Sequence, residues 1–225
     1  KWDDLIMETL EKFFWNNEVT KNNLKYPNTQ IIRFVKHSIP DVSKTILDFG
    51  CGAGRNSIAL AGEGYSVIAI DCAEEAVEMV RRKAKDKNYN IKCLVNSNEC
   101  QVPVENKSID AIIADGSLFY KDFKGTIKLL MDLKNVLVKN GIMWADWRSN
   151  DDYLYGMGKK LEDDYFQMNE ASGRLGARYH FFNKDTLENV YKQAGFEIVS
   201  VDKFEYTENN GKRKNSWYHV IAKNV

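Results

Sequence analysis

The chain has 225 residues, 44% of them hydrophobic, and its 32 Lys and Arg residues balance its 32 Asp and Glu residues. This size and hydrophobic content suit one domain with a buried core. A balanced charge creates no overall field that would attract nucleic acid or an anionic membrane, so we expect neither as a partner. No apolar run approaches the roughly 20 residues that span a bilayer.

Residues 1–44 are expected to form an N-terminal helical cap. The stretches "WDDLIMETLEKFF" and "NTQIIRFVKHSI" both have apolar residues at helical spacing. Two amphipathic helices of this kind can cover one edge of a sheet that follows them in the chain.

From residue 45 onward, short apolar runs alternate with amphipathic stretches. Runs typical of buried strands occur at 45–49, 66–70, 91–95, 111–114 and 141–145, and residues 74–85 have helical spacing. Strands that alternate with helices indicate βαβ crossovers. We therefore predict an α/β fold for residues 45–225, with a doubly wound, mainly parallel seven-stranded sheet.

The last part of the chain has a different pattern. Residues 150–180 are irregular, and we predict a partly helical insertion or lid there. Residues 186–194 predict a helix. The segments "FEIVSVDKF" and "SWYHVIAK", joined by the turn-like "TENNGKRKN", predict an antiparallel hairpin that completes the sheet.

The segment "ILDFGCGAGRNS" predicts a strand, a glycine-rich turn and the start of a helix. Glycines in such a turn allow a ligand to approach the backbone, although a tight βα turn alone is the simpler interpretation. Asp71 ends the next predicted strand, where a carboxylate can accept hydrogen bonds from ribose hydroxyls. Asp71 can alternatively cap the following helix, which has Glu74 three residues on. The G-x-G-x-G spacing departs from the dinucleotide fingerprint, and no P-loop is present, so a nucleoside without phosphates fits better.

The stretch "ILDFGCGAGRNSIALAGEGYSVIAIDCAEEAVEMVRRKA" resembles motif I and the following acidic motif of class I S-adenosylmethionine-dependent methyltransferases. "VPVENKSIDAIIADGSLFY" and "LKNVLVKNGIMWADWRS" are similar to the fourth- and fifth-strand segments of that family. The resemblance covers about residues 45–225 and implies S-adenosylmethionine as the cofactor.

The resemblance also implies cofactor-binding positions in this sequence. Asp48 would support the glycine loop, Asp71 would hold the ribose hydroxyls, and Cys72 would pack beside the adenine. Asn at position 98 departs from the acid that the family often presents to the adenine amine. The full implied set is Asp48, Gly50, Cys51, Gly52, Gly54, Asn56, Asp71, Cys72, Asn98, Glu99, Asp115, Gly116 and Ser117.

Three residues are candidates for the acceptor side and for catalysis, because they map to the carboxyl ends of the strands. His180 is either a general base or part of an edge segment. Arg148 either forms a salt bridge with Asp146 or Asp151, or holds a carboxylate or phosphate of the acceptor. Tyr120 is the third candidate.

The sequence favours transfer of a methyl group to oxygen or nitrogen of a small polar metabolite, with sugar, surface-polysaccharide and natural-product intermediates as candidates. A cofactor-binding sensor or partner subunit, and a nicotinamide-dependent oxidoreductase, are the alternatives. The cysteines Cys51, Cys72, Cys93 and Cys100 lack metal-site spacing and are typical of a reduced, cytoplasmic protein, so no metal is expected. We expect a monomer or a homodimer.

Overall fold

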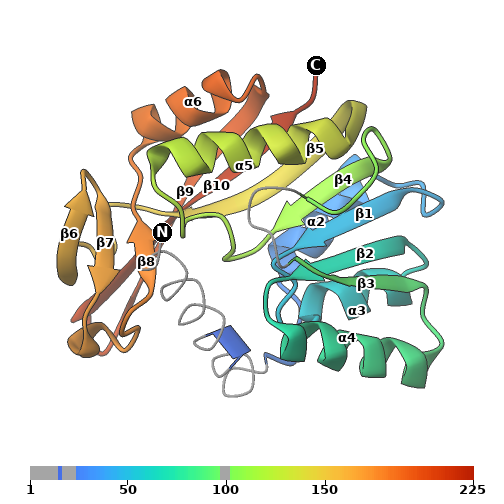
Figure 1. Cartoon of the computed structure of the whole chain (residues 1–225), viewed down its shortest axis with the longest axis horizontal. Coiled ribbons are helices and arrows are strands. Elements are labelled where there is room, and N and C mark those ends of the chain that lie inside the picture. Colours follow the sequence, from blue (N-terminus) through green and yellow to red (C-terminus); the bar gives the residue numbers. More distant parts are fainter. Residues whose placement is uncertain (1–14, 17–23, 97–101) are drawn as a thin grey trace, which may run out of the picture.

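The computed structural model describes residues 15–16, 24–96 and 102–225. Seven strands form one sheet in the order β3-β2-β1-β4-β5-β10-β9. Strands β1 to β5 pair in parallel, whereas β10 is antiparallel to both β5 and β9. The predicted mainly parallel sheet with a terminal antiparallel hairpin is thus confirmed (Figure 1). The strands of this sheet are β1 (Thr45–Phe49), β2 (Ser66–Asp71), β3 (Ile91–Val95), β4 (Ile109–Ala114), β5 (Leu137–Arg148), β9 (Glu197–Glu208) and β10 (Arg213–Lys223).

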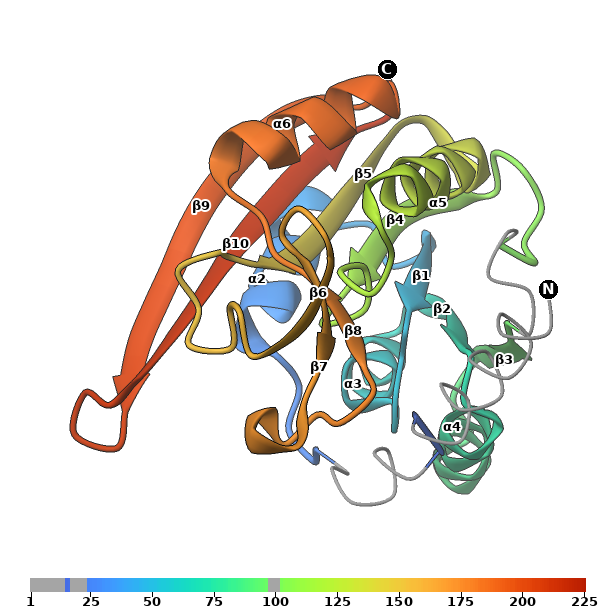
Figure 2. The ribbon, with the colours of Figure 1, turned by 60° about the vertical axis from the view of Figure 1, so that its left-hand side comes forward.

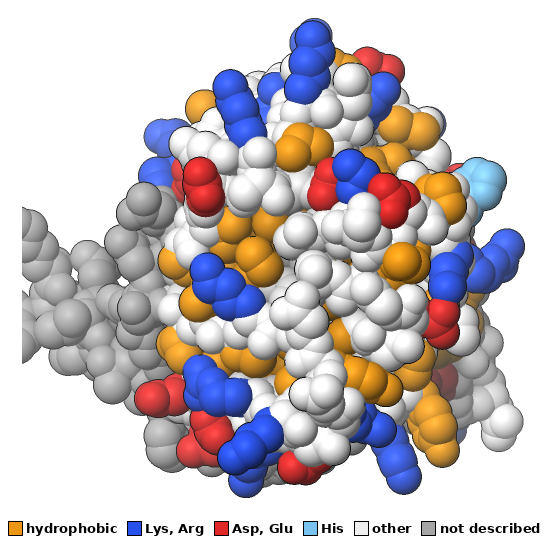
Figure 3. Space-filling view, turned by 90° about the vertical axis from the view of Figure 1, so that its right-hand side faces the viewer, with side chains coloured by type: hydrophobic (Ala, Val, Ile, Leu, Met, Phe, Trp, Pro, Cys, Tyr) orange, Lys and Arg blue, Asp and Glu red, His pale blue; other side chains and the backbone are white. Residues whose placement is uncertain are grey.

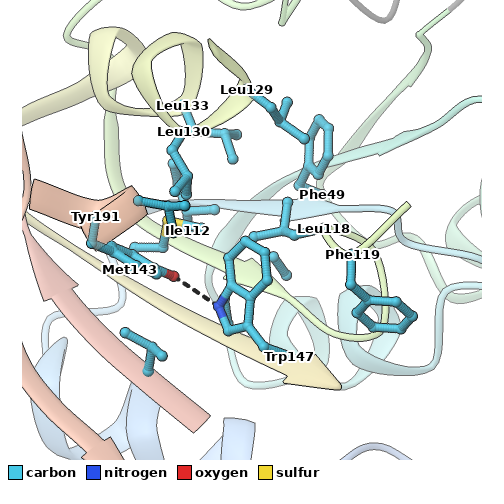
Figure 4. Close-up of a cluster of buried hydrophobic side chains, with 14 of the residues drawn as sticks. Phe49, Ile112, Leu118, Phe119, Leu129, Leu130, Leu133, Met143, Trp147 and Tyr191 are labelled. Carbon is cyan, nitrogen blue, oxygen red and sulfur yellow. Dashed lines mark hydrogen bonds between the residues drawn. The ribbon is translucent and has the colours of Figure 1, made fainter. Parts of the chain in front are cut away.

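Helices cover both faces of the sheet, as Figure 1 shows. On one face lie α5 (Phe123–Val136) and α6 (Lys184–Gln193), and on the other lie α2 (Thr29–Ser38), α3 (Arg55–Gly62) and α4 (Glu74–Lys87). Successive side chains of β4 point to opposite faces of the sheet. Ile112 belongs to the hydrophobic cluster under α5 and α6, and Ile113 belongs to the cluster under α2 and α3. Within the first cluster, Trp147 Nε1 donates a hydrogen bond of 3.1 Å to the hydroxyl of the buried Tyr191 (Figure 4).

The insertion at 150–180 differs from the prediction of a partly helical segment. It forms a second, three-stranded antiparallel sheet of β6 (Gly158–Glu162), β7 (Tyr165–Met168) and β8 (Arg178–His180), with only the single 3₁₀ turn η1 (Glu170–Ser172). Aromatic side chains pack in this region, where the ring centroids of Tyr155 and Phe166 lie 5.3 Å apart. The role of the insertion as a lid stays a prediction.

The terminal hairpin is longer than the sequence pattern predicted. Both strands continue through most of "TENNGKRKN", and the connecting turn contains Asn209, Asn210 and Gly211 in the left-handed region. Consequently the tip of the hairpin extends well beyond the rest of the sheet (Figure 2).

Charged side chains of both signs are mixed on the surface. On the side of the molecule shown in Figure 3, Lys and Arg alternate with Asp and Glu among smaller apolar areas. Among the described helices, none has the length and apolar character needed to cross a membrane.

Candidate functional site

The glycine turn between β1 and α3 is held by its own amide groups. The N–H groups of Gly50 and Cys51 both donate to the carbonyl of Ile70, at 2.8 and 2.9 Å. The N–H of Gly52 donates to Asp71 Oδ2 at 2.8 Å. Since these donors already have acceptors within the protein, the turn is not arranged as a phosphate cradle of the dinucleotide type.

The three turn glycines have positive φ values of 74°, 50° and 83° but differ in their surroundings. A Cβ added at Gly50 would lie 2.2 Å from the Cβ of Ser117, and one added at Gly54 would lie 2.6 Å from a methyl carbon of Val80. At Gly52, nothing lies within 4 Å of that position. Gly50 and Gly54 are therefore required by packing within the protein, whereas Gly52 faces open space that a ligand can use.

Asp71 lies at the end of β2 and supports both neighbouring segments. Its Oδ2 accepts a hydrogen bond from the N–H of Gly52, and its Oδ1 accepts one of 2.9 Å from the N–H of Ala73. Ala73 is the N-cap of α4, so the alternative capping box between Asp71 and Glu74 is not what the structure shows. Burial raises the pKa of Asp71, and burial together with the Asp71 carboxylate raises the pKa of the Cys72 thiol to about 12. Cys72 is therefore a neutral thiol beside an acid that still has lone pairs available.

Two further carboxyl groups are buried at the same edge of the sheet. Asp48 on β1 accepts a 2.5 Å hydrogen bond from Ser57 Oγ in α3, and burial raises its pKa to about 7. The support of the glycine loop by Asp48, directly or through water, stays a prediction. Asp146 on β5 accepts a hydrogen bond of 2.5 Å from the N–H of Gly116. Its pKa is raised to about 8, mainly by burial and to a lesser extent by the nearby charge of Asp115. Acids thus gather at the carboxyl ends of β1, β2, β4 and β5.

Asp115, at the end of β4, is the centre of a polar cluster that the sequence did not reveal. Its Oδ2 accepts hydrogen bonds from Arg55 Nη2 at 2.5 Å and from Asn56 Nδ2 at 2.9 Å. Its Oδ1 accepts a hydrogen bond from Asn28 Nδ2 at 3.2 Å. The backbone N–H of Asn28 also donates to Asn56 Oδ1 at 2.9 Å. The sequence signal that could have drawn attention to Asn28 is its position directly before an amphipathic stretch. Asn is a preferred N-cap residue, and Asn28 is the N-cap of α2.

The segment after β4 joins this cluster to the possible acceptor side. Gly116 has φ of 73° and, like Gly52, has nothing within 4 Å of the position that a Cβ would take. Ser117 Oγ donates to the carbonyl of Phe49 at 2.7 Å, and the Tyr120 hydroxyl donates to the carbonyl of Gly116 at 2.9 Å. The ring of Trp15 contacts Tyr120 edge-on, with ring centroids 4.7 Å apart.

Arg148 does not pair with Asp146 or Asp151, the two partners considered from the sequence. Its Nη1 lies 2.9 Å from Oδ1 of the buried Asp152, four residues further along the chain, whereas Asp151 pairs with Lys203. The guanidinium lies over the ring of Trp217 at 4.0 Å from its centroid. Its Nε is buried and has no hydrogen-bond acceptor among the described residues.

His180 is packed into the junction between the two sheets. Its backbone N–H donates to the carbonyl of Phe119 at 2.8 Å, and its Nδ1 lies 3.1 Å from the carbonyl of Lys121. The ring stacks on Phe182 at 4.2 Å between centroids, and burial lowers the pKa of His180. These contacts account for His180 as an anchor, and its role as a base stays a prediction.

Two of the expected adenine contacts, Asn98 and Glu99, lie outside the described residues, as does Cys100. Within the described ranges, no three His, Cys, Asp or Glu side chains are grouped so that they could hold a metal ion.

Comparison with known proteins gives a match over the centre of the chain. Residues 46–141 match the family described as "Methyltransferase domain". A cypemycin N-terminal methyltransferase from Streptomyces sp is 34% identical over 62 residues, covering 28% of this chain and 25% of that protein. A ubiquinone biosynthesis O-methyltransferase from Coxiella burnetii is 29% identical over 91 residues, covering 40% of this chain and 37% of that protein. The chain thus matches less than two fifths of the length of these relatives.

Solved structures show the same fold over a larger share of the chain. A SAM-dependent methyltransferase from Methanosarcina mazei superposes with a TM-score of 0.72 and 22% sequence identity, covering 85% of this chain and 97% of that one. The Rossmann-like sheet and its order of strands and helices are therefore a shared architecture.

Proposed function

We propose that the chain transfers a methyl group from S-adenosylmethionine to oxygen or nitrogen of a small polar metabolite. The match of residues 46–141 to a methyltransferase domain and the fold shared with a SAM-dependent methyltransferase support this proposal. The observation that carries this proposal is the open space beside Gly52 and Gly116, with Asp71 hydrogen-bonded to the N–H of Gly52 and Asp146 to the N–H of Gly116. That combination suits a nucleoside that bears positive charge and no phosphate.

The residues present fit such a cofactor. Asp71 has carboxylate lone pairs left for two ribose hydroxyls after its bonds to Gly52 and Ala73. Gly52 and Gly116 leave room for ligand atoms near the backbone. Asp115 supplies a carboxylate that suits a sulfonium or an ammonium group, and Asp146 fixes the N–H of Gly116 beside it. When bound, the cofactor supplies an electrophilic methyl group attached to a sulfonium sulfur.

We assign the side of the site beyond Gly116 to the acceptor. The Tyr120 ring forms part of its wall, and the buried Arg148 offers an Nε–H donor that has no hydrogen-bond acceptor among the described residues. These residues would align an acceptor and exclude water, which is the main requirement of an in-line methyl transfer.

The relatives include methyltransferases that act on nitrogen and on oxygen. By their names, the Streptomyces relative acts on an N-terminus and the Coxiella relative is an O-methyltransferase. Sugar, surface-polysaccharide and natural-product intermediates are the candidate acceptors that we propose for a cytoplasmic enzyme.

Calorimetric titration with S-adenosylmethionine, S-adenosylhomocysteine and NAD tests the proposal. We expect saturable one-to-one binding of the first two and none of NAD, because the turn amides of Gly50, Cys51 and Gly52 are not available to a pyrophosphate. Binding of NAD alone would favour an oxidoreductase and contradict the proposal.

A second measurement separates an enzyme from a binding protein. The protein is incubated with methyl-labelled S-adenosylmethionine and fractionated pools of small polar metabolites. We expect label in at least one pool, dependent on the intact chain and lost in the D71A variant. Tight cofactor binding without transfer to any pool would favour the sensor or partner-subunit alternative.

A further inference from the structure

Among the described residues, the outer edge of β9 is the longest strand edge without a neighbouring strand. β9 is the last strand in the sheet order, and it is hydrogen-bonded only to β10 among the described elements. Figure 2 shows no described element beyond it. An exposed strand edge presents a row of backbone donors and acceptors to another chain.

The hairpin projects beyond the point where the rest of the sheet ends. β10 pairs with β5 only from Trp217, opposite Arg148, to Lys223. The pairs from Glu205–Ser216 to Glu208–Arg213 lie past that end. The projecting part of β9 therefore lies beyond the end of β5, and among the described strands only β10 pairs with it.

The projecting strand also exposes apolar side chains. Phe204 is 42% exposed and Tyr206 is 44% exposed, and their ring centroids lie 5.8 Å apart on one face of the strand. Lys203 and Glu205 lie on the opposite face, with Nζ of Lys203 3.1 Å from Oε1 of Glu205. A partner must therefore match an aromatic face and a charged face at the same time.

The strand "EIVSVDKFEYTE" is complementary to itself. In a dimer, two antiparallel copies of β9 are related by a twofold axis normal to the sheet, and each side chain stays on the same face of the sheet in both copies. One residue must therefore lie opposite its own copy at the axis. With Phe204 at the centre, Phe204 faces its copy, Lys203 faces Glu205 twice, and Asp202 faces the Tyr206 hydroxyl twice.

Neighbouring registers are unfavourable. Centring the pair on Asp202, Lys203 or Glu205 places like charges directly opposite each other, which destabilises a sheet. The register centred on Phe204 pairs residues 200–208 of both copies, and it is the register that places Lys203 opposite Glu205.

We propose that the protein forms a homodimer in which β9 of one copy pairs antiparallel with β9 of a second copy, with Phe204 at the twofold axis. The pairing extends the two seven-stranded sheets into one continuous sheet. It is isologous and uses the β9 edge of both copies, so assembly through β9 closes at two chains.

Charge reversal tests the proposal through a heterodimer. K203E places acid opposite acid in a homodimer, and E205K places base opposite base, so each variant alone should be monomeric at concentrations where the wild type is a dimer. An equimolar mixture restores two acid–base pairs and should dimerise again. K85E, at an exposed position on α4, is the matched control and should resemble the wild type. Sedimentation velocity measures all five samples, and circular dichroism confirms that the variants are folded.

A monomeric wild type at about 100 µM, well above the Kd of a stable dimer, would overturn the proposal. So would two single variants that dimerise as well as the wild type, or a mixture that stays monomeric.

Cysteine cross-linking tests the register independently of the charge variants. F204C should form an intermolecular disulfide under a mild oxidant, because the two Cα atoms of opposite residues lie roughly 4.5–5.5 Å apart. D202C should not, because its copy is four residues away along the pair, and the wild-type chain controls for the native cysteines. Efficient cross-linking of D202C but not of F204C would overturn the proposed register.

Discussion

The glycines of the turn after β1 show that a similar sequence position can serve different purposes. Gly50 and Gly54 are close to Ser117 and Val80, whereas Gly52 has nothing within 4 Å of the position of an added Cβ. From the sequence we treated all three alike, either as room for a ligand or as parts of a tight turn. Packing distances divide them into two structural positions and one that faces the proposed cofactor.

Alanine substitutions should separate these roles. G52A adds a Cβ to open space in a left-handed conformation and should cost about 1–2 kcal/mol of unfolding free energy while weakening S-adenosylmethionine binding. G50A should cost roughly a further 1–3 kcal/mol, because its Cβ overlaps Ser117. Urea denaturation measures the stability and calorimetry measures the binding.

The double variant G50A/S117G provides the control for this overlap. Removing the Ser117 side chain leaves the added carbon 3.5 Å from the Ser117 Cα, an ordinary contact. It should therefore recover part of the stability lost in G50A. Equal destabilisation by G50A and G52A, or no recovery in the double variant, would contradict the assignment.

Asp146 should make the stability of the protein depend on pH. Its pKa is about 8 when folded, against an ordinary value of 3.8, so the folded chain binds more protons than the unfolded chain between about pH 4 and 8. Stability from this group therefore falls as pH rises through that window. D146N stays neutral, and its Oδ1 can still accept from Gly116 N.

We expect D146N and wild type to have similar unfolding free energies near pH 5. At pH 9 the variant should be more stable by roughly 1–3 kcal/mol, because the wild type must keep a charge buried. Urea denaturation at both pH values tests this, with D86N on the exposed face of α4 as the control. A difference between the two proteins that does not change with pH would show that Asp146 does not titrate in this window.

At the scale of elements, the small sheet of β6, β7 and β8 is joined to the main body through His180. The carbonyls of Phe119 and Lys121, which precede α5, both contact this one residue. The isolated bridge between Ser149 and Phe182 adds a second connection. A third contact comes from β7, where the Tyr165 hydroxyl donates to the carbonyl of Tyr120 at 3.1 Å. The insertion is thus held at β7 and β8, and the contact of His180 Nδ1 with Lys121 contributes to its position.

Two substitutions distinguish an anchor from a general base at position 180. In H180N the amide nitrogen can replace Nδ1 as donor to Lys121, whereas H180A leaves that carbonyl without this donor at a cost of about 1–3 kcal/mol. We expect H180N to retain the stability, the cofactor affinity and most of the turnover of the wild type, and H180A to unfold at lower urea. A stable H180N whose turnover falls by roughly a hundredfold or more would instead identify a base.

The sequence predicted the elements whose periodicity is strong and missed those set by distant contacts. The strands at 45–49 and 91–95 have the predicted bounds, because continuous apolar runs between turn residues leave few alternatives. The insertion was misassigned because strands of three to five residues, such as "RYH", carry too few residues for a period to emerge. The hairpin was underestimated because polar residues in its exposed half resemble a turn. Asn28 and Arg55 were missed because their partner, Asp115, is 60 or more residues away.

At the scale of the whole molecule, segments far apart in the chain meet over the carboxyl edge of the sheet. Trp15 contacts Tyr120 after β4, and Asn16 Oδ1 accepts a long hydrogen bond of 3.4 Å from Glu75 N at the start of α4. Residues 15–16 therefore bridge two segments that flank the glycine turn. The N-terminal cap over residues 1–44 stays a prediction, because residues 1–14 and 17–23 lie outside the described part of the chain.

This bridge should affect ligand release more than folding. The Trp15–Tyr120 ring pair is worth about 0.5–1.5 kcal/mol, and Tyr120 is bonded to Gly116 beside the proposed cofactor site. We expect W15A to weaken S-adenosylmethionine binding by about two- to tenfold, mainly through faster dissociation, with an unfolding free energy close to that of wild type.

W15F keeps the aromatic contact and should bind nearly as tightly as the wild type. Stopped-flow measurement of dissociation compares the three proteins. Unchanged dissociation in W15A would place residues 15–16 outside the functional site, and equal losses in W15A and W15F would point to the indole nitrogen rather than to ring packing.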